Sequence, residues 1–267
     1  MTGDPDIMVA VGPDNVSDFL NFLAGVGAAE LPQALQPAET SAKENPDDIL
    51  RGVFSRVGQE YGFDKVEAEF VAFKNFTVRW QRSCKWADFK VSDYLADAPP
   101  EVIEGLCNSL FSKIAGENKG YSEEMCAWIT SSEFVERSRP TFLRRSIDLT
   151  RSAIGDTKDL NAAYDRLIAL GLVERDPTAC LSWSNNKCTR KISNCTVLMR
   201  TITISSILDT DEIPNFVLDY CLYHELCHLM IGFDPSENRH EEFQELVKKF
   251  PYSEEAEELI AKLRLFL

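Results

Sequence analysis

The stretch DEIPNFVLDYCLYHELCHLMIGFDPSENRHEEFQELVKKF, residues 211–250, contains the clearest helix signals and all three histidines of the chain. Pro214 stands where a helix would begin and Gly232 where it would end, because proline favours the first helical position and glycine the position after the last. Between them the residues are apolar on nearly every side, which is typical of a helix buried in a core. We therefore predict a buried helix between Pro214 and Gly232.

This helix carries a pattern of metal-ligating residues. His224 and His228 are four residues apart, so they share one helix face, where two imidazoles can converge on one Zn²⁺. Glu225 is rotated by about 100° around the axis. It is therefore placed to reach a water held by the metal rather than to act as an equivalent ligand. The chain has only three histidines, and composition alone would produce this H-E-x-x-H order with a probability of roughly 0.002.

The third histidine, His240, begins a second predicted helix, where it shares a stripe with Phe243, Val247 and Phe250. We expect His240 to face inward and to be the third zinc ligand. Three protein ligands leave a position for water, as in catalytic zinc, whereas structural zinc usually has four ligands, mostly cysteines. A structural or inactive zinc site is the alternative, which Cys227 disfavours because it points about 100° off the ligand stripe.

The eight cysteines include no CxxC pair. A disulfide scaffold is usually shorter, secreted and denser in cysteine. We predict reduced thiols, several of them buried. The alternative is a thiolate metal site formed by Cys180, Cys188 and Cys195, although their spacing matches no zinc-ribbon pattern.

The composition is that of an ordinary globular protein: 267 residues, of which 44% are hydrophobic and 27% charged, with a net charge of −15. Such acidity disfavours wrapping of nucleic acid and binding to an anionic membrane surface. No apolar run approaches the roughly 20 residues that span a bilayer, and the N-terminus has no signal-peptide shape. We expect a soluble, cytoplasmic protein.

The chain divides into an acidic, proline-containing extension over 1–45 and one α+β domain over 46–267, with parts 46–156 and 157–267. Residues 1–50 hold nine acidic residues against one basic residue, and an apolar stripe over 16–26 indicates a short helix in the extension. Further elements are expected from capping, periodicity and alternation. They are a helix capped by Asp47, strands over 66–73, 75–83 and 86–92 in a meander, helices over 100–115 and 158–170, and strands over 180–184 and 197–206.

At the histidine motif and its flanks the sequence resembles the SprT-like family of zincin metallopeptidases and the small YgjP-like proteins. The likeness covers about residues 65–265 and is carried by LSWSNN (181–186), RTITISSILD (200–209), IPNFVLDYCLYHELCHL (213–229) and RHEEFQELVKKFP (239–251). The resemblance implies a zincin-like core with a small sheet, an H-E-x-x-H helix and a second ligand-bearing helix, beside an N-terminal β-meander and helices.

The resemblance also implies a function. His224, His228 and His240 would bind Zn²⁺, and Glu225 would act on the bound water as general base to cleave a peptide or protein substrate. The strand around 200–206 would border the cleft and could pair with an extended peptide. Three residues are candidates for stabilising the transition state because they are close to the motif in the sequence: Tyr223, Arg239 and Tyr252. For each of them, a role in packing or on the surface is the more usual one.

Three alternatives remain open at this point. The first is a zinc hydrolase of nucleotides or RNA, which a basic pocket near His224 would favour. The second is a catalytically silent zinc-binding protein. The third is a regulated protease whose acidic segment 1–45 plugs the cleft.

Overall fold

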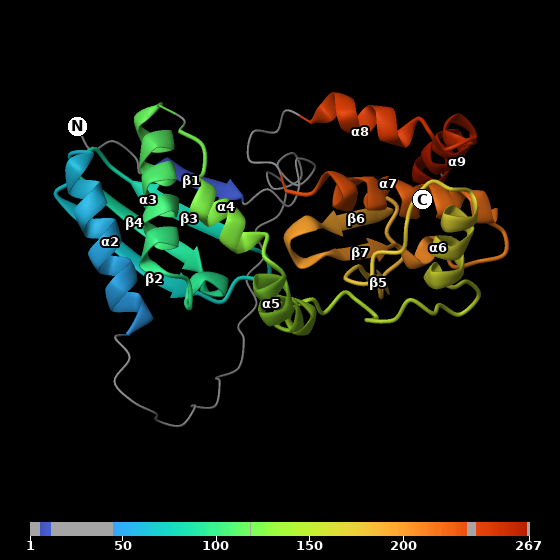
Figure 1. Cartoon of the computed structure of the whole chain (residues 1–267), viewed down its shortest axis with the longest axis horizontal. Coiled ribbons are helices and arrows are strands. Elements are labelled where there is room, and N and C mark those ends of the chain that lie inside the picture. The colour runs from blue at the N-terminus through green and yellow to red at the C-terminus, as the bar shows by residue number, and fades with distance from the viewer. Residues whose placement is uncertain (1–5, 12–44, 118, 234–238, 266–267) are drawn as a thin grey trace, which may run out of the picture. The chain divides into compact units, whose positions relative to one another are not determined.

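The structure is a computed structural model that describes residues 6–11, 45–117, 119–233 and 239–265 (Figure 1). The chain forms two compact units, Met1–Met125 and Cys126–Leu267. Their boundary falls earlier than the division at 156/157 inferred from the sequence. Helices and two sheets are both present, which confirms the α+β class. The short helix expected over 16–26 lies outside the described residues.

The first unit contains a four-stranded sheet whose order differs from the predicted meander. The strands are β1 (Asp6–Val11), β2 (Lys65–Val71), β3 (Thr77–Arg82) and β4 (Trp86–Ser92), in the order β1-β3-β4-β2. β3 and β4 form an antiparallel hairpin, but β2 pairs in parallel with β4. The meander was wrong because the connection 72–76 passes the end of β4. Ser92 Oγ donates to the Asn75 carbonyl (3.4 Å) and the Tyr94 hydroxyl to the Lys74 carbonyl (2.8 Å).

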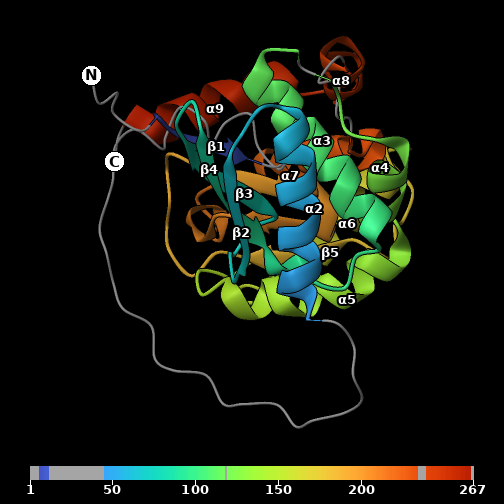
Figure 2. The same ribbon diagram turned by 90° about the vertical axis from the view of Figure 1, so that its left-hand side faces the viewer.

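Helices α2 (Pro46–Glu60) and α3 (Pro100–Ala115) lie on the same face of this sheet (Figure 2). The rings of Phe54 and Phe111 both contact Phe89 from β4, at 4.9 and 5.2 Å between centroids, and lie 6.4 Å from each other. Asn45, not Asp47, is the N-cap of α2, because its side chain accepts the Asp47 N–H (3.2 Å). The Asp47 carboxylate instead accepts the Phe70 N–H (3.0 Å), which ties the start of α2 to β2.

The second unit holds a three-stranded sheet in the order β5-β7-β6, made of β5 (Cys180–Trp183), β6 (Ser193–Thr196) and β7 (Thr201–Ile204). β7 pairs in parallel with β5 and antiparallel with β6. The predicted strand over 197–206 was too long, because the chain must reverse between β6 and β7. The short helical turn Val197–Met199 makes that reversal and ends at Arg200, whose φ of 47° is left-handed.

Because β7 is the central strand, the expectation that residues 200–206 form the strand at the cleft edge is corrected. Both of its edges are used by β5 and β6. β6, which was not predicted as a strand, is the outer strand on the side of helix α7, with which it is in contact.

Helix α7 (Asn215–Ile231) confirms the predicted buried helix. Pro214 precedes its first turn, and Gly232 ends it with a φ of 74°. The helix packs against β6, β7 and three helices, α6 (Leu160–Ala169), α8 (His240–Val247) and α9 (Ser253–Leu265). α6 begins after the cap Asp159 and is followed by Gly171 at a φ of 69°, as the sequence predicted within two residues. The remaining helices are α4 (Glu123–Ile129) and α5 (Ser132–Arg145).

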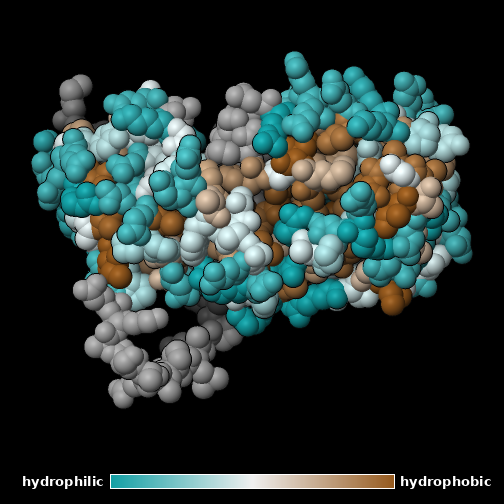
Figure 3. Space-filling model, in the orientation of Figure 1, coloured by the Kyte–Doolittle hydropathy of each residue, from teal (hydrophilic) through white to brown (hydrophobic). Residues whose placement is uncertain are grey.

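The surface of α8 is acidic, and the cysteines form no disulfide among the described residues. Hydrophilic residues lie along α8 in Figure 3, where Glu241, Glu242 and Glu245 are exposed. All eight cysteines lie within the described residues and are free thiols. Among the described residues, no helix combines the length and the apolar character that crossing a bilayer requires.

Candidate metal centre

Helix α7 brings His224, Glu225 and His228 together, with one potential ligand atom from each within 4.8 Å of the others. The two imidazole centroids are 5.3 Å apart and the ring planes are inclined by 72°. Two imidazoles that bind one Zn²⁺ at about 2.0–2.1 Å would have centroids about 5 Å apart. The two histidines therefore fit a shared metal ion.

The Glu225 side chain is buried, with 5% of the residue exposed. Its Oε1 accepts a 2.6 Å hydrogen bond from Ser193 Oγ and lies 3.4 Å from His224 Nδ1. Burial by itself raises the pKa of the carboxyl, but His224, Ser193 and the nearby His228 together hold the pKa of Glu225 below its ordinary value. Glu225 is therefore a carboxylate at neutral pH, as a general base must be.

Ser193 is a site residue that the sequence analysis missed. It is the first residue of β6, and a strand of four residues gives too short an alternation to be recognised. No motif links Ser193 to Glu225, which lies 32 residues further along the chain. Only the packing of β6 on α7 brings the two side chains into contact.

His240 is the first residue of α8, and its side chain is exposed rather than turned inward. It is not part of the group of ligand atoms formed by the described residues. Phe243, one turn further on, contacts both imidazoles instead: its ring stacks on His228 at 4.2 Å and meets His224 edge-on at 5.0 Å. Val247 is buried, as its place on the same stripe predicted. The role of His240 as third ligand stays a prediction.

The three residues considered for transition-state stabilisation each have a partner other than the Glu225 carboxylate. Tyr223 is fully buried and its hydroxyl donates to the Leu246 carbonyl (2.7 Å), which joins α7 to α8. Arg239 is exposed and donates to the carbonyl of Ile231 (2.9 Å). Tyr252 is exposed, with its ring 5.9 Å from that of Phe216. Their catalytic role stays a prediction.

Two polar contacts anchor the turn of α7 that precedes the histidines. Arg166 of α6 forms a bidentate ion pair with Asp219, with N···O distances of 2.9 and 2.6 Å. The hydroxyl of Tyr220 donates to Glu257 of α9, and its ring lies 6.2 Å from that of His224. These contacts hold α7 against its neighbours from two sides.

Burial lowers the pKa of His228 below its ordinary value, although the Glu225 carboxylate acts in the opposite direction. Between the lowered value and about 6.5, the unfolded chain binds more protons at this residue than the folded chain. In metal-free protein we therefore expect His228 to reduce stability as the pH falls through that window. Urea denaturation at pH 7.5 and 5.5 measures the effect.

The loss of stability between these two pH values should be smaller in His228→Gln than in the wild type. His240→Gln, which removes an exposed histidine from α8, controls for the loss of a histidine. Equal pH dependence in the wild type and His228→Gln would contradict the prediction.

Comparison of the chain with protein-family models, curated proteins and solved structures finds no match. The resemblance to SprT-like zincins therefore depends on the sequence segments quoted above, and membership of that family stays a prediction.

Proposed function

We propose that the protein is a zinc-dependent hydrolase that cleaves peptide bonds, with Glu225 as its general base. The observation that carries the proposal is a buried carboxylate, held by Ser193, next to two imidazoles whose separation suits one metal ion. His224 and His228 would hold the metal, with His240 as the proposed third ligand.

The protein side chains have defined tasks in this reaction. Zn²⁺, when bound, supplies a Lewis acid that lowers the pKa of a water towards 7 and polarises a carbonyl group. Glu225 accepts a proton from the attacking water as the new C–O bond forms. It then donates that proton to the leaving amine as the C–N bond breaks. Both contacts of the carboxylate use Oε1, so we assign the proton transfer to Oε2.

We assign the substrate-binding edge to β6 in place of the strand expected over 200–206. β6 is an outer strand of its sheet in the described part of the chain and contacts α7. An extended peptide can add to a sheet edge through main-chain hydrogen bonds. A peptide on this edge would run past Ser193, and therefore close to the Glu225 carboxylate that Ser193 binds.

A nucleotide is the second candidate substrate. Lys187 and Arg190 are exposed on the loop that joins β5 to β6 and leads into Ser193, and basic side chains can bind a phosphate-bearing substrate. The acidic net charge of −15 disfavours long RNA but leaves a small nucleotide open.

Metal analysis of the purified full chain, combined with assays of a quenched peptide library and of nucleoside triphosphates, tests the proposal. We expect about one zinc per chain and peptide cleavage that a chelator abolishes and added Zn²⁺ restores. Hydrolysis of nucleotides alone would favour the second candidate. Zinc without turnover would identify a silent zinc-binding protein, and absence of zinc binding would overturn the proposal.

A further inference from the structure

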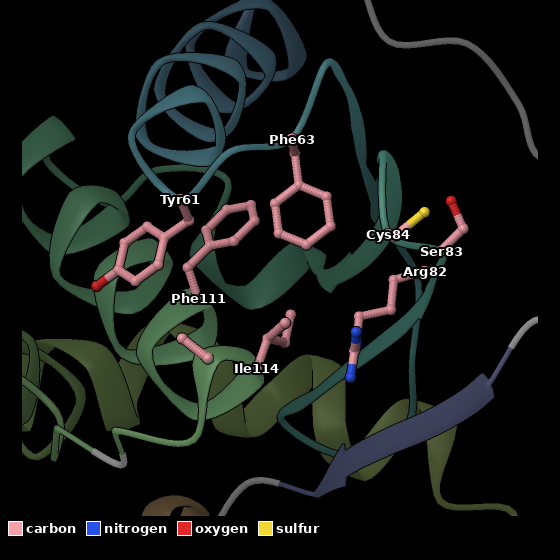
Figure 4. Close-up of a pocket in the computed structure, with 8 residues that line it drawn as sticks. Tyr61, Phe63, Arg82, Ser83, Cys84, Phe111 and Ile114 are labelled. Carbon is pink, nitrogen blue, oxygen red and sulfur yellow. The ribbon is translucent and has the colours of Figure 1, made fainter.

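The first unit contains a pocket of about 170 Å³ that its own residues line (Figure 4). The rings of Tyr61, Phe63 and Phe111 form one wall, with Ile114 beside them, and Arg82 reaches into the same space from β3. Cys84 lies at the rim and is exposed. None of these residues takes part in the proposed hydrolysis.

Arg82 occupies a position where the strand pattern calls for an apolar residue. Side chains two residues apart point to the same side of a strand, and the two preceding members of this set, Val78 and Trp80, are 5% and 4% exposed. Arg82 is the third member, and its cross-strand neighbours are Asp6 on β1 and the small, buried Ala87 on β4. The small side chain of Ala87 leaves room for the guanidinium at the end of the apolar core.

One N–H of the Arg82 guanidinium has no acceptor among the described residues. Its Nε is buried and has no hydrogen-bond partner. A buried N–H without a partner costs about 1–3 kcal/mol in general. The Arg82 side chain also lines the pocket and is partly exposed, so its guanidinium can donate to an acceptor from outside the chain.

The opposite wall defines the rest of the ligand. The ring of Phe111 stacks on that of Tyr61 at 5.6 Å and lies 5.4 Å from that of Phe63. Aromatic walls favour a flat apolar body, and an Arg fork favours a carboxylate. Ligand pockets usually measure about 300–1,000 Å³, so this smaller space suits a single ring with a short acidic arm.

We propose that this pocket binds a small aromatic carboxylate, with its ring against Phe63 and Phe111 and its carboxylate on Arg82. This assignment is independent of the proposed hydrolase activity, because it involves none of the same residues.

Calorimetric titration of the full chain with phenylacetate and with its neutral isostere phenylacetamide tests the proposal. We expect a Kd of about 1 mM or lower for phenylacetate, as a ligand of this size allows, and at least tenfold weaker binding of the amide. Equal binding of the two compounds, or no binding of phenylacetate at tenfold higher concentration, would overturn the proposal.

Two variants on β3 assign the binding to Arg82. Arg82→Gln should weaken phenylacetate binding at least tenfold, whereas Arg79→Gln, on the exposed side of the same strand, should leave it unchanged. If Arg82→Gln does not fold, Arg82→Lys keeps the charge but loses the planar fork, and should also bind more weakly. Wild-type affinity in the Arg82 variant would contradict the assignment.

Alkylation of Cys84 locates the ligand. Phenylacetate should slow the reaction of iodoacetamide with Cys84, read by peptide mass spectrometry, because this exposed thiol lies at the pocket rim. An unchanged rate at saturating phenylacetate would place the ligand elsewhere and overturn the proposal.

Discussion

Replacement of Glu225 by Gln is expected to lower kcat for peptide hydrolysis by about 10²- to 10⁴-fold while zinc content stays at the wild-type level. Glutamine has nearly the same shape, and its amide oxygen can still accept the hydrogen bond from Ser193. It cannot accept a proton from water at neutral pH, so only the proton transfer is removed. Single-turnover rates and metal analysis of the same preparation measure the two quantities.

Glu245→Gln is the matched control, because Glu245 is exposed on α8 and the substitution makes the same change of charge. It should hydrolyse the peptide at the wild-type rate. If Glu225→Gln also kept that rate, Glu225 would not be the general base. If it lost its zinc, Glu225 would act in metal binding rather than in proton transfer alone.

Replacement of Arg166 by Met is expected to lower the free energy of unfolding by about 2–3 kcal/mol at pH 7. The variant leaves the buried carboxylate of Asp219 without its bidentate partner. Loss of one member of a buried pair costs about 3–5 kcal/mol, and we expect less because 38% of the Arg166 side chain is exposed. Urea denaturation of metal-free protein measures the change.

The pH dependence identifies the cause of this loss. Burial raises the pKa of Asp219 even in the presence of Arg166. A carboxyl with a raised folded-state pKa binds more protons in the folded chain, so it reduces stability as the pH rises above its unfolded value of about 3.9. Without Arg166 the pKa should rise further, and the destabilisation should shrink as the pH is lowered towards 5 and Asp219 becomes protonated.

Two further variants separate the buried charge from other effects. Arg166→Met combined with Asp219→Asn should recover part of the stability, because no buried charge remains. Lys262→Met breaks an exposed pair with Glu258 on α9 and should change stability by less than about 1 kcal/mol. A loss in Arg166→Met that does not depend on pH would show that packing, not charge, is its cause.

Helices whose ends are marked by proline or glycine could be predicted from the sequence. The bounds of α7 follow from Pro214 and Gly232, and the start of α3 follows from Pro100. The proximity of His224, Glu225 and His228 also follows from helical geometry, since one turn of one helix carries all three. Asp47 shows the limit of local signals: the sequence suggests a helix N-cap, but its carboxylate accepts a hydrogen bond from the Phe70 N–H of β2.

The α7 helix, its ends and the convergence of two histidines follow from local sequence, because these depend on residues within about one helical turn of each other. The pairing of β2 with β4 and the outer place of β6 follow only from the folded chain. So do the hydrogen bond from Ser193 to Glu225 and the contact of Phe243, rather than His240, with the imidazoles. These outcomes depend on pairings between distant segments, whose energies come from burial and hydrogen bonds that no local pattern encodes.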